Sequence, residues 1–265
     1  MRELMINSVH KAIRILRLFS ASEPRLTLAQ VSTRLDIPKS TAHNLLTTLI
    51  AEGFVEKVRH DQYALGTGML PLSQAIRVNV EVRDPAAPML RQLADASRES
   101  AYLTVRDGNY ALYIYAVESP QRLIARTAIG DRVHMHCTSV GKAILSGMTD
   151  DELRAVVEQA GMPVFTQNTI SDLDVLRHEL ETIRRQGYVL DRSEHEEGVY
   201  CVGAAIFNSE RHVLGACSVS GVDPEIVGHR CAELSRLVVN TAQQISRLMG
   251  YVPGRMSAVN DLALD

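Results

Sequence analysis

A short segment after Pro38 carries polar side chains at a spacing that suits contact with double-stranded DNA. Apolar residues recur there at i, i+3, i+4, i+7 and i+8: Ala42, Leu45, Leu46, Leu49 and Ile50. This spacing predicts a helix with one buried stripe, which begins at Ser40 and is capped by Gly53. The opposite face holds short hydrogen-bonding side chains: Ser40, Thr41, His43, Asn44, Thr47 and Thr48. Such a face, free of carboxylates, can enter a major groove and contact base edges and phosphates.

A second group of candidate residues lies where a loop enters a helix, in the segment HMHCTSVGK. Small residues expose backbone N–H groups there, and the N-terminus of a helix attracts carboxylate or phosphate groups. Ser139, Val140 and Gly141 could therefore form one wall of an anion site. A plain helix cap would explain the same three residues.

Strand residues near the C-terminus could line the same pocket. Ser218 and Ser220 share one face of a predicted strand, because strand side chains alternate with period two, and Cys201 lies on the strand before. We expect Cys201 to be inert. The alternative is a thiol enzyme or redox sensor that uses Cys201 or Cys137, with a histidine as base. The chain has four cysteines and no CxxC spacing, so neither a zinc knuckle nor a disulfide framework is indicated.

The loop DRSEHEEG places four carboxylates around His195. A metal site could combine His195 with Glu194 or Glu196, and with His134 and His136, which are two residues apart. No fixed ligand spacing supports this hypothesis. We therefore expect a solvated loop, no bound metal and no cofactor.

Three predicted helices and a β-hairpin position the polar face. The first helix spans about residues 8–20, and the second begins at the N-cap Thr27 and is stopped by Pro38. After the polar helix, strands at 54–58 and 62–65 form a hairpin with Arg59 at its tip. This is the outline of a winged helix-turn-helix, which we expect to cover residues 1–68.

The rest of the chain predicts a second domain of mixed helices and strands. A linker helix is expected at 70–80, within a linker of 69–83, and a new helix begins at Asp84-Pro85. Further strands are expected at 101–106, 110–118, 123–127, 188–192, 201–207 and 212–220, and helices at 149–160, 172–186 and 224–249. This order indicates an α+β domain over 84–250, an antiparallel sheet flanked by helices, and a disordered tail over 251–265.

Composition limits the class of protein. The 265 residues are 46% hydrophobic, with no apolar run long enough to cross a membrane and no signal peptide, which favours a globular cytoplasmic protein. The net charge of -3 is uneven, because residues 1–77 hold ten Lys and Arg against six Asp and Glu. The positive charge accompanies the helix-turn-helix, as expected for a domain that meets phosphates.

Four blocks of sequence together resemble the IclR family of bacterial transcriptional regulators, over about residues 5–250. The blocks are SVHKAIRILRLFS, IPKSTAHNLLTTLIAEGFVEK, HMHCTSVGKAIL and GYVLDRSEHEEGVYCVGAAIF. Their order and spacing make the resemblance specific, since a helix-turn-helix alone fits many families.

The resemblance implies a winged helix-turn-helix, a linker helix and a C-terminal effector domain with a GAF-like fold. It also implies homodimers or dimers of dimers, and it implies a regulator rather than an enzyme. Such a protein would bind operator DNA, as the repressor of a catabolic operon, under the control of a small organic acid.

The resemblance also assigns residues. For the effector it implies Ser139, Val140, Asp191, Val199, Cys201, Ser218 and Ser220, to which Gly141 is added from the helix start. For DNA it implies Lys39, Ser40, Thr41, His43 and Asn44, with Arg59 in the wing. Many members carry Arg where this chain has Asn44, and because Asn pairs with adenine where Arg prefers guanine, we expect a different operator sequence.

Overall fold

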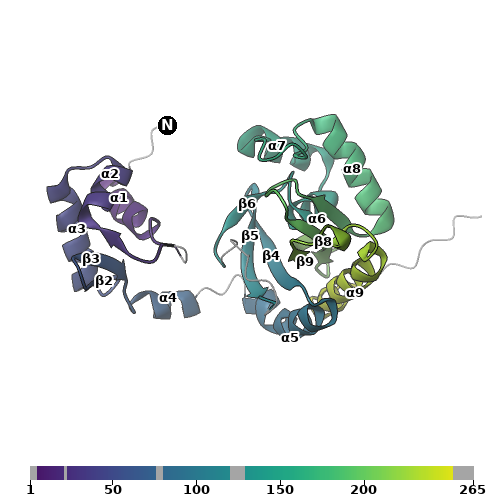
Figure 1. Cartoon of the computed structure of the whole chain (residues 1–265), viewed down its shortest axis with the longest axis horizontal. Helices are drawn as coiled ribbons and strands as arrows, with labels where there is room; N and C mark the ends of the chain where they lie inside the picture. The colour runs from purple at the N-terminus through teal and green to yellow at the C-terminus, as the bar shows by residue number, and fades with distance from the viewer. Residues whose placement is uncertain (1–4, 21–22, 76–79, 120–128, 253–265) are drawn as a thin grey trace, which may run out of the picture. The chain divides into compact units, whose positions relative to one another are not determined.

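The computed structural model describes residues 5–20, 23–75, 80–119 and 129–252. The chain divides into two compact units, Met1–Val78 and Asn79–Asp265. Figure 1 shows the helices and strands of each unit. Among the described residues, every helix is too short or too polar to span a membrane.

The first unit is a winged helix-turn-helix. Its elements are α1 (Asn7–Leu16), β1 (Leu26–Thr27), α2 (Leu28–Leu35), α3 (Lys39–Ala51), β2 (Val55–Val58), β3 (Gln62–Leu65) and α4 (Met69–Ala75). The N-cap expected at Thr27 is present, with Gln30 completing a capping box, and α2 ends where Asp36 adopts a left-handed conformation. The strands form one antiparallel sheet in the order β1-β3-β2.

Two elements of this unit differ from the prediction, the first helix and strand β1. The helix expected over 8–20 ends at Leu16, although Phe19 is still buried against the same core. The helical spacing of apolar residues continues as far as Phe19, although the chain after Leu16 forms a turn and not a helix. Strand β1 was not predicted, because its two residues, Leu26 and Thr27, are too few to show a period.

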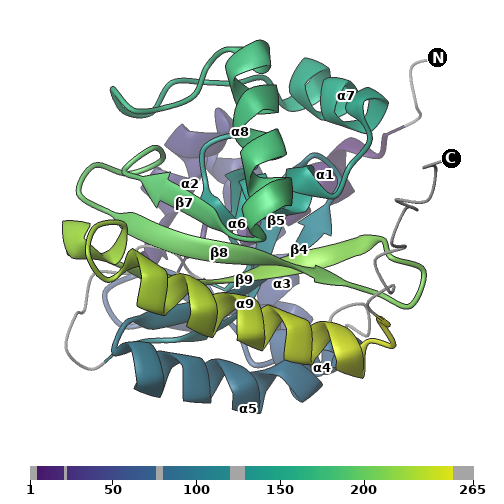
Figure 2. The ribbon, with the colours of Figure 1, turned by 90° about the vertical axis from the view of Figure 1, so that its right-hand side faces the viewer.

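The second unit is built on a six-stranded antiparallel sheet in the order β6-β5-β4-β9-β8-β7. The strands are β4 (Ser100–Asp107), β5 (Tyr110–Val117), β6 (Arg132–His134), β7 (Val189–Arg192), β8 (Tyr200–Phe207) and β9 (Val213–Gly221). One apolar core packs α5 (Val80–Ser97) and α9 (Cys231–Leu248) on one face of the sheet. A second core packs α6 (Ser139–Ser146), α7 (Asp150–Ala160) and α8 (Leu173–Gln186) on the other, as Figure 2 shows.

The helix start predicted at Asp84-Pro85 is wrong. Helix α5 begins at Val80 and carries both Pro85 and Pro88 inside it. Val82 is buried with Ala86 four residues on, so the apolar stripe of the helix continues upstream of the expected start. The burial of that stripe outweighs the hydrogen bond that each proline removes.

The single helix expected over 224–249 is divided into a short 3-10 helix, Pro224–Ile226, and α9. The strand expected at 123–127 lies outside the described residues, as do residues 76–79 of the linker helix and 253–265 of the tail.

Candidate functional sites

The polar face of α3 is exposed. Ser40, His43, Asn44, Thr47 and Thr48 lie in solvent, and Thr41 is half-buried. On the opposite side Ala42, Leu46 and Leu49 are buried. The predicted stripe is weaker at Leu45, which is half-buried, and at Ile50, which is 37% exposed.

Hydrogen bonds divide this face into two groups. The hydroxyls of Thr47 and Thr48 donate to the backbone carbonyls of His43 and Asn44, at 2.9 and 3.0 Å. Within the described structure, the side chains assigned to DNA form no internal hydrogen bond or ion pair; they are Lys39, Ser40, Thr41, His43 and Asn44. The N-cap of α3, Pro38, also gives no side-chain cap, so first-turn N–H groups face outward for a phosphate to accept.

The wing is a tight hairpin. Strands β2 and β3 pair from Val55↔Leu65 to Val58↔Gln62. Three residues, 59–61, join the strands, and His60 and Asp61 both have positive φ, of 62° and 52°, as a short hairpin loop requires. Lys57 forms an exposed ion pair with Asp61 at 2.7 Å, while Arg59 is exposed beside them.

A small cavity of about 40 Å³ lies in the second unit, against the N-terminus of α6. It brings together six of the eight residues assigned to the effector: Ser139, Asp191, Val199, Cys201, Ser218 and Ser220. Sequence reasoning did not assign its other lining residues to the effector: Tyr102, Tyr113, Thr138, His195 and Glu196.

Strand register explains why distant residues meet at this cavity. Asp191 of β7 is level with Cys201 of β8, and Cys201 is level with Ser220 of β9. One step along the sheet, Ser218 is level with Gly203 on one side and with Tyr102 of β4 on the other. These rows place the polar side chains under the first turn of α6.

Two glycines allow α6 to approach the sheet. A Cβ on Gly141 would collide with the backbone of Met135, and a Cβ on Gly203 would lie 3.1 Å from Ser139. Gly141 and Val140 are buried but are not among the described residues that line the cavity. Their place is in the packing of α6, and Val140 belongs to the apolar core.

The start of α6 is not the open anion site that the sequence suggested. The backbone N–H of Ser139 faces the carboxylate of Asp191 and lowers its pKa, and the Gly141 N–H donates to the hydroxyl of the N-cap, Thr138. The protein's own groups thus occupy these two donors. An incoming carboxylate would have to share or displace Asp191.

Asp191 belongs to a buried charge network. Its Oδ1 accepts from the Glu194 N–H at 2.9 Å. The ammonium of Lys142, which is fully buried, donates to Glu194 Oε1 at 2.7 Å and to the Leu190 carbonyl at 2.9 Å. Burial, followed by repulsion from Glu194, raises the pKa of Asp191 to about 7. The carboxyl therefore changes charge near neutral pH.

Two tyrosines complete the cavity. Tyr102 and Tyr113 meet edge to face, with ring centroids 5.5 Å apart. Burial raises the pKa of Tyr102 to about 12 and that of Tyr113 well above its usual value, so both are neutral donors at pH 7. The sequence showed a hairpin rich in aromatic residues, but the face of each residue depended on its register.

The cysteines are poor nucleophiles. Burial is the main cause that raises the pKa of Cys201 and of Cys137, which stay protonated at neutral pH. The Cys201 thiol donates to Ser220 Oγ at 3.1 Å. Cys137 Sγ lies 3.6 Å from His195 Nδ1, but burial lowers the pKa of His195 and so weakens it as a base. This geometry does not support the thiol alternative.

The three histidines of the metal hypothesis gather around an aromatic ring. The ring of Phe165 lies 4.6 Å from that of His195, 5.5 Å from that of His134 and 6.4 Å from that of His136, between centroids. Burial lowers the pKa of His136 to about 4, and its Nε2 lies 3.1 Å from the Pro163 carbonyl. In the part of the chain that the structure describes, no three metal-binding side chains converge.

Comparison with known proteins bears on both sites. Residues 8–59 match the family model described as the IclR helix-turn-helix domain, and residues 74–247 match that of the bacterial transcriptional regulator IclR C-terminal domain. The regulator KipR of Bacillus subtilis is 31% identical over 92% of this chain and 97% of its own. The repressor AllR of Escherichia coli is 30% identical over 92% and 90%.

Solved structures agree with these relatives. The IclR protein of Thermotoga maritima is 28% identical, with a TM-score of 0.78 over 93% of this chain and all of its own. An IclR homologue from Microbacterium hydrocarbonoxydans, solved with 4-hydroxybenzoate, has a TM-score of 0.80 over 92% of this chain and 99% of its own. At 20% identity, that homologue supports the fold alone.

Proposed function

Because this chain belongs to the IclR family of bacterial transcriptional regulators, we propose that it is a repressor of a catabolic operon controlled by a small organic acid. Its relatives are named as regulators and not as enzymes. The observation that carries the proposal is the small polar cavity, whose lining includes a carboxyl group with a pKa of about 7.

The DNA-binding part of the proposal rests on the side chains of α3 that form no internal hydrogen bond or ion pair within the described structure. Asn44 would read a base edge, with adenine as its favoured partner, while Lys39 would pair with a phosphate. Ser40, Thr41 and His43 would add contacts to phosphates and bases from the same face. Arg59, at the exposed tip of the wing, would contact the neighbouring backbone.

The effector side rests on the lining of the cavity. Neutral Asp191 could donate to a ligand carboxylate, which its ionised form would repel. The hydroxyls of Ser218, Ser220 and Tyr102 could supply further hydrogen bonds. Ser139, Val199 and Cys201 would form the remaining wall.

The size of the cavity suggests how a ligand could act. A volume of about 40 Å³ holds about three water molecules. An acid larger than this must enlarge the cavity and move the elements around it. A ligand that binds only the enlarged state would shift the balance between two conformations, which control by an effector requires.

A palindromic operator presents two half-sites, which two recognition helices can contact at once. We propose a homodimer or a dimer of dimers, in which paired α3 helices read half-sites roughly 34–36 Å apart, or a multiple of that distance. Enlarging the cavity would change the relative placement of the paired helices.

Footprinting of the purified protein on the DNA upstream of its own gene tests this function. We expect a protected palindrome whose affinity falls steeply with salt, since several phosphates are neutralised. The same DNA is then titrated with hydroxy, keto and aromatic acids, including 4-hydroxybenzoate. The absence of a salt-sensitive protected palindrome would contradict the DNA function, and unchanged DNA affinity in every acid would contradict the effector function.

A further inference from the structure

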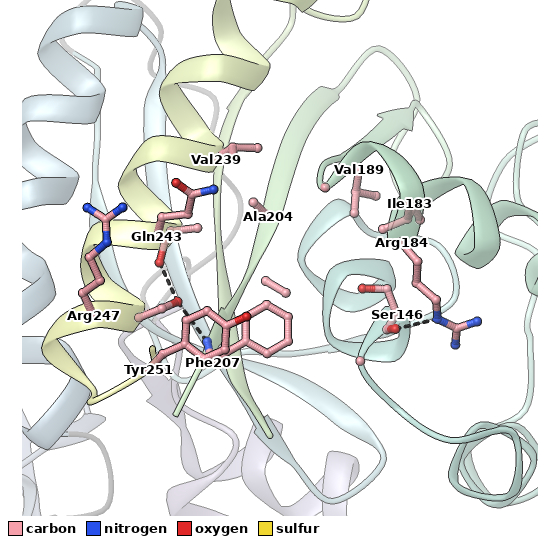
Figure 3. Close-up of a pocket in the computed structure, with 15 residues that line it drawn as sticks. Ser146, Ile183, Arg184, Val189, Ala204, Phe207, Val239, Gln243, Arg247 and Tyr251 are labelled. Atoms are coloured by element: carbon pink, nitrogen blue, oxygen red, sulfur yellow. Dashed lines mark hydrogen bonds between the residues drawn. The ribbon is translucent and has the colours of Figure 1, made fainter. Parts of the chain in front are cut away.

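A second and much larger cavity, of about 540 Å³, lies at the other end of α6. Its walls come from the C-terminal ends of α6 and α8, the last residues of β8 and the later turns of α9. Figure 3 shows Val239 and Gln243 on α9 facing Ile183, Arg184 and Val189 across it. This volume falls within the range of small-molecule sites in proteins.

The cavity exists because β7 is too short to cover β8. Strand β7 pairs with β8 only as far as Val189↔Gly203. Residues 204–207 of β8 have no strand neighbour on that side within the described structure. The N–H of Phe207 donates instead to the hydroxyl of Ser246 on α9, at 3.0 Å. The space that a longer β7 would fill is left open.

The lining combines apolar walls with two arginines, Arg184 and Arg247. Ile183, Val189, Ala204 and Val239 supply aliphatic walls, and the ring of Phe207 stacks on that of Tyr251 with centroids 5.3 Å apart. The guanidinium of Arg184 is fixed by donation to the carbonyls of Ser146, at 2.8 Å, and Met148, at 3.2 Å. It forms no ion pair among the described residues, and three of its five N–H donors are unused by those bonds.

The charges around the cavity favour an anion. No Asp or Glu is among the described residues that line it, whereas Arg184 and Arg247 are. A planar guanidinium with unused donors suits a carboxylate, and the apolar walls suit a hydrocarbon or aromatic body. We propose that this cavity is a second ligand site, distinct from the effector cavity, for a carboxylic acid with a bulky apolar body.

The two cavities share one helix. Ser139, the first residue of α6, lines the small cavity, and Ser146, the last, lines the large one. The helix is eight residues long, roughly 12 Å at 1.5 Å per residue, and its residues from Ser139 to Leu145 are buried. A ligand that shifts the C-terminal end of α6 will therefore alter the cavity at its N-terminal end.

Calorimetric titration of the full-length protein with naphthalene-2-carboxylate, and separately with its neutral methyl ester, tests the proposal. We expect the acid to bind the wild type at least tenfold more tightly than the ester does. Val239→Trp fills the large cavity and should weaken both ligands at least tenfold. Val199→Trp, a matched replacement of a half-buried valine in the small cavity, should change both affinities less than twofold.

Two further variants test the role of charge. Arg184→Gln should weaken the acid about tenfold and leave the ester within twofold, and binding of the ester then reports that the cavity is intact. Arg185→Gln is the control, because Arg185 is exposed on the same helix and does not line the cavity. Equal affinity for acid and ester, or binding lost in Val199→Trp and kept in Val239→Trp, would overturn the proposal.

The same variants examine the competing occupant, a second copy of the chain. Light scattering should give the same mass for Val239→Trp and wild type. A smaller assembly in Val239→Trp, with no binding of the acid by the wild type, would identify the cavity as an interface between copies and refute the ligand site. The test does not depend on the proposed effector, because Val199→Trp separates the two cavities.

Discussion

A lysine lies 2.7 Å from a carboxylate on the wing and again beside the small cavity, but the two ion pairs lie in different surroundings. Lys57 and Asp61 are exposed on the wing. Lys142 and Glu194 are buried beside the cavity. The same difference separates the two candidate sites. The side chains of α3 that are assigned to DNA have no internal hydrogen-bond partner within the described structure, whereas polar groups at the cavity are bonded to one another. We therefore expect DNA binding by the exposed face of α3 to depend on salt concentration. The buried network at the cavity should depend instead on pH.

The largest expected effect is on the buried pair. Lys142→Met leaves Glu194 and Asp191 without their cation, and we expect a loss of about 3–5 kcal/mol in the free energy of unfolding. Urea denaturation followed by circular dichroism measures it. Lys57→Met is the matched control and should leave stability unchanged within error. Equal losses in the two variants would remove the contrast between the sites.

A smaller effect is expected on the recognition face. Asn44→Ala should reduce discrimination between operator variants by about 1–3 kcal/mol at one base pair, because a bidentate contact to a base edge is lost. Lys39→Ala should instead weaken binding to every sequence and reduce the salt slope by about one phosphate contact. Fluorescence anisotropy on a panel of operators at several salt concentrations separates these outcomes. If the two variants behave alike on every operator, the assigned roles are wrong.

The third effect concerns protons. The pKa of Asp191 is raised, so its carboxyl is neutral below about pH 7 and ionised above it. A carboxylate ligand should therefore bind about tenfold more weakly at pH 8 than at pH 6. Calorimetric titration with the acid that most strongly shifts operator affinity measures this dependence. Asp191→Asn should flatten it, and a pH profile unchanged in Asp191→Asn would exclude the carboxyl as its source.

The smallest effect is expected at the thiol. Cys201→Ser should change the half-maximal concentration of effector less than threefold, because the buried thiol is protonated and serves only as a weak donor to Ser220. Operator binding with and without effector checks this. A response lost in Cys201→Ser, together with oxidation of Cys201 in the wild type, would restore the redox sensor as a hypothesis.

Periodicity and capping were enough to predict much of the fold. The cap at Thr27, the helix over 149–160 and the strands at 101–106 and 110–118 follow from local sequence alone, and the structure contains them as α2, α7, β4 and β5. Local rules failed where packing overrode them. Pro85 looked like a helix start, but the burial of Val82 extends α5 beyond it.

The polar face of α3 could be predicted from the sequence, because the helical period alone determines which residues share a face. The cavity could be read only in part. Ser218 and Ser220 share a face by alternation, but Tyr102 joins them only through its register with Ser218, across more than a hundred residues. The burial of Lys142 could not be predicted from its neighbours in the sequence, because its partner Glu194 is 52 positions away.

Gly203 suggests how the ligand specificity of such a cavity could change in evolution. It lies under the first turn of α6, where a single added methyl group would press on Ser139. Such a replacement would displace the wall of the cavity by a few tenths of an ångström without adding any group that touches a ligand. Under the proposed function, the range of acids that provoke a response would therefore drift through positions that never meet the ligand, and sequences with the same cavity lining would differ in the acids that they detect.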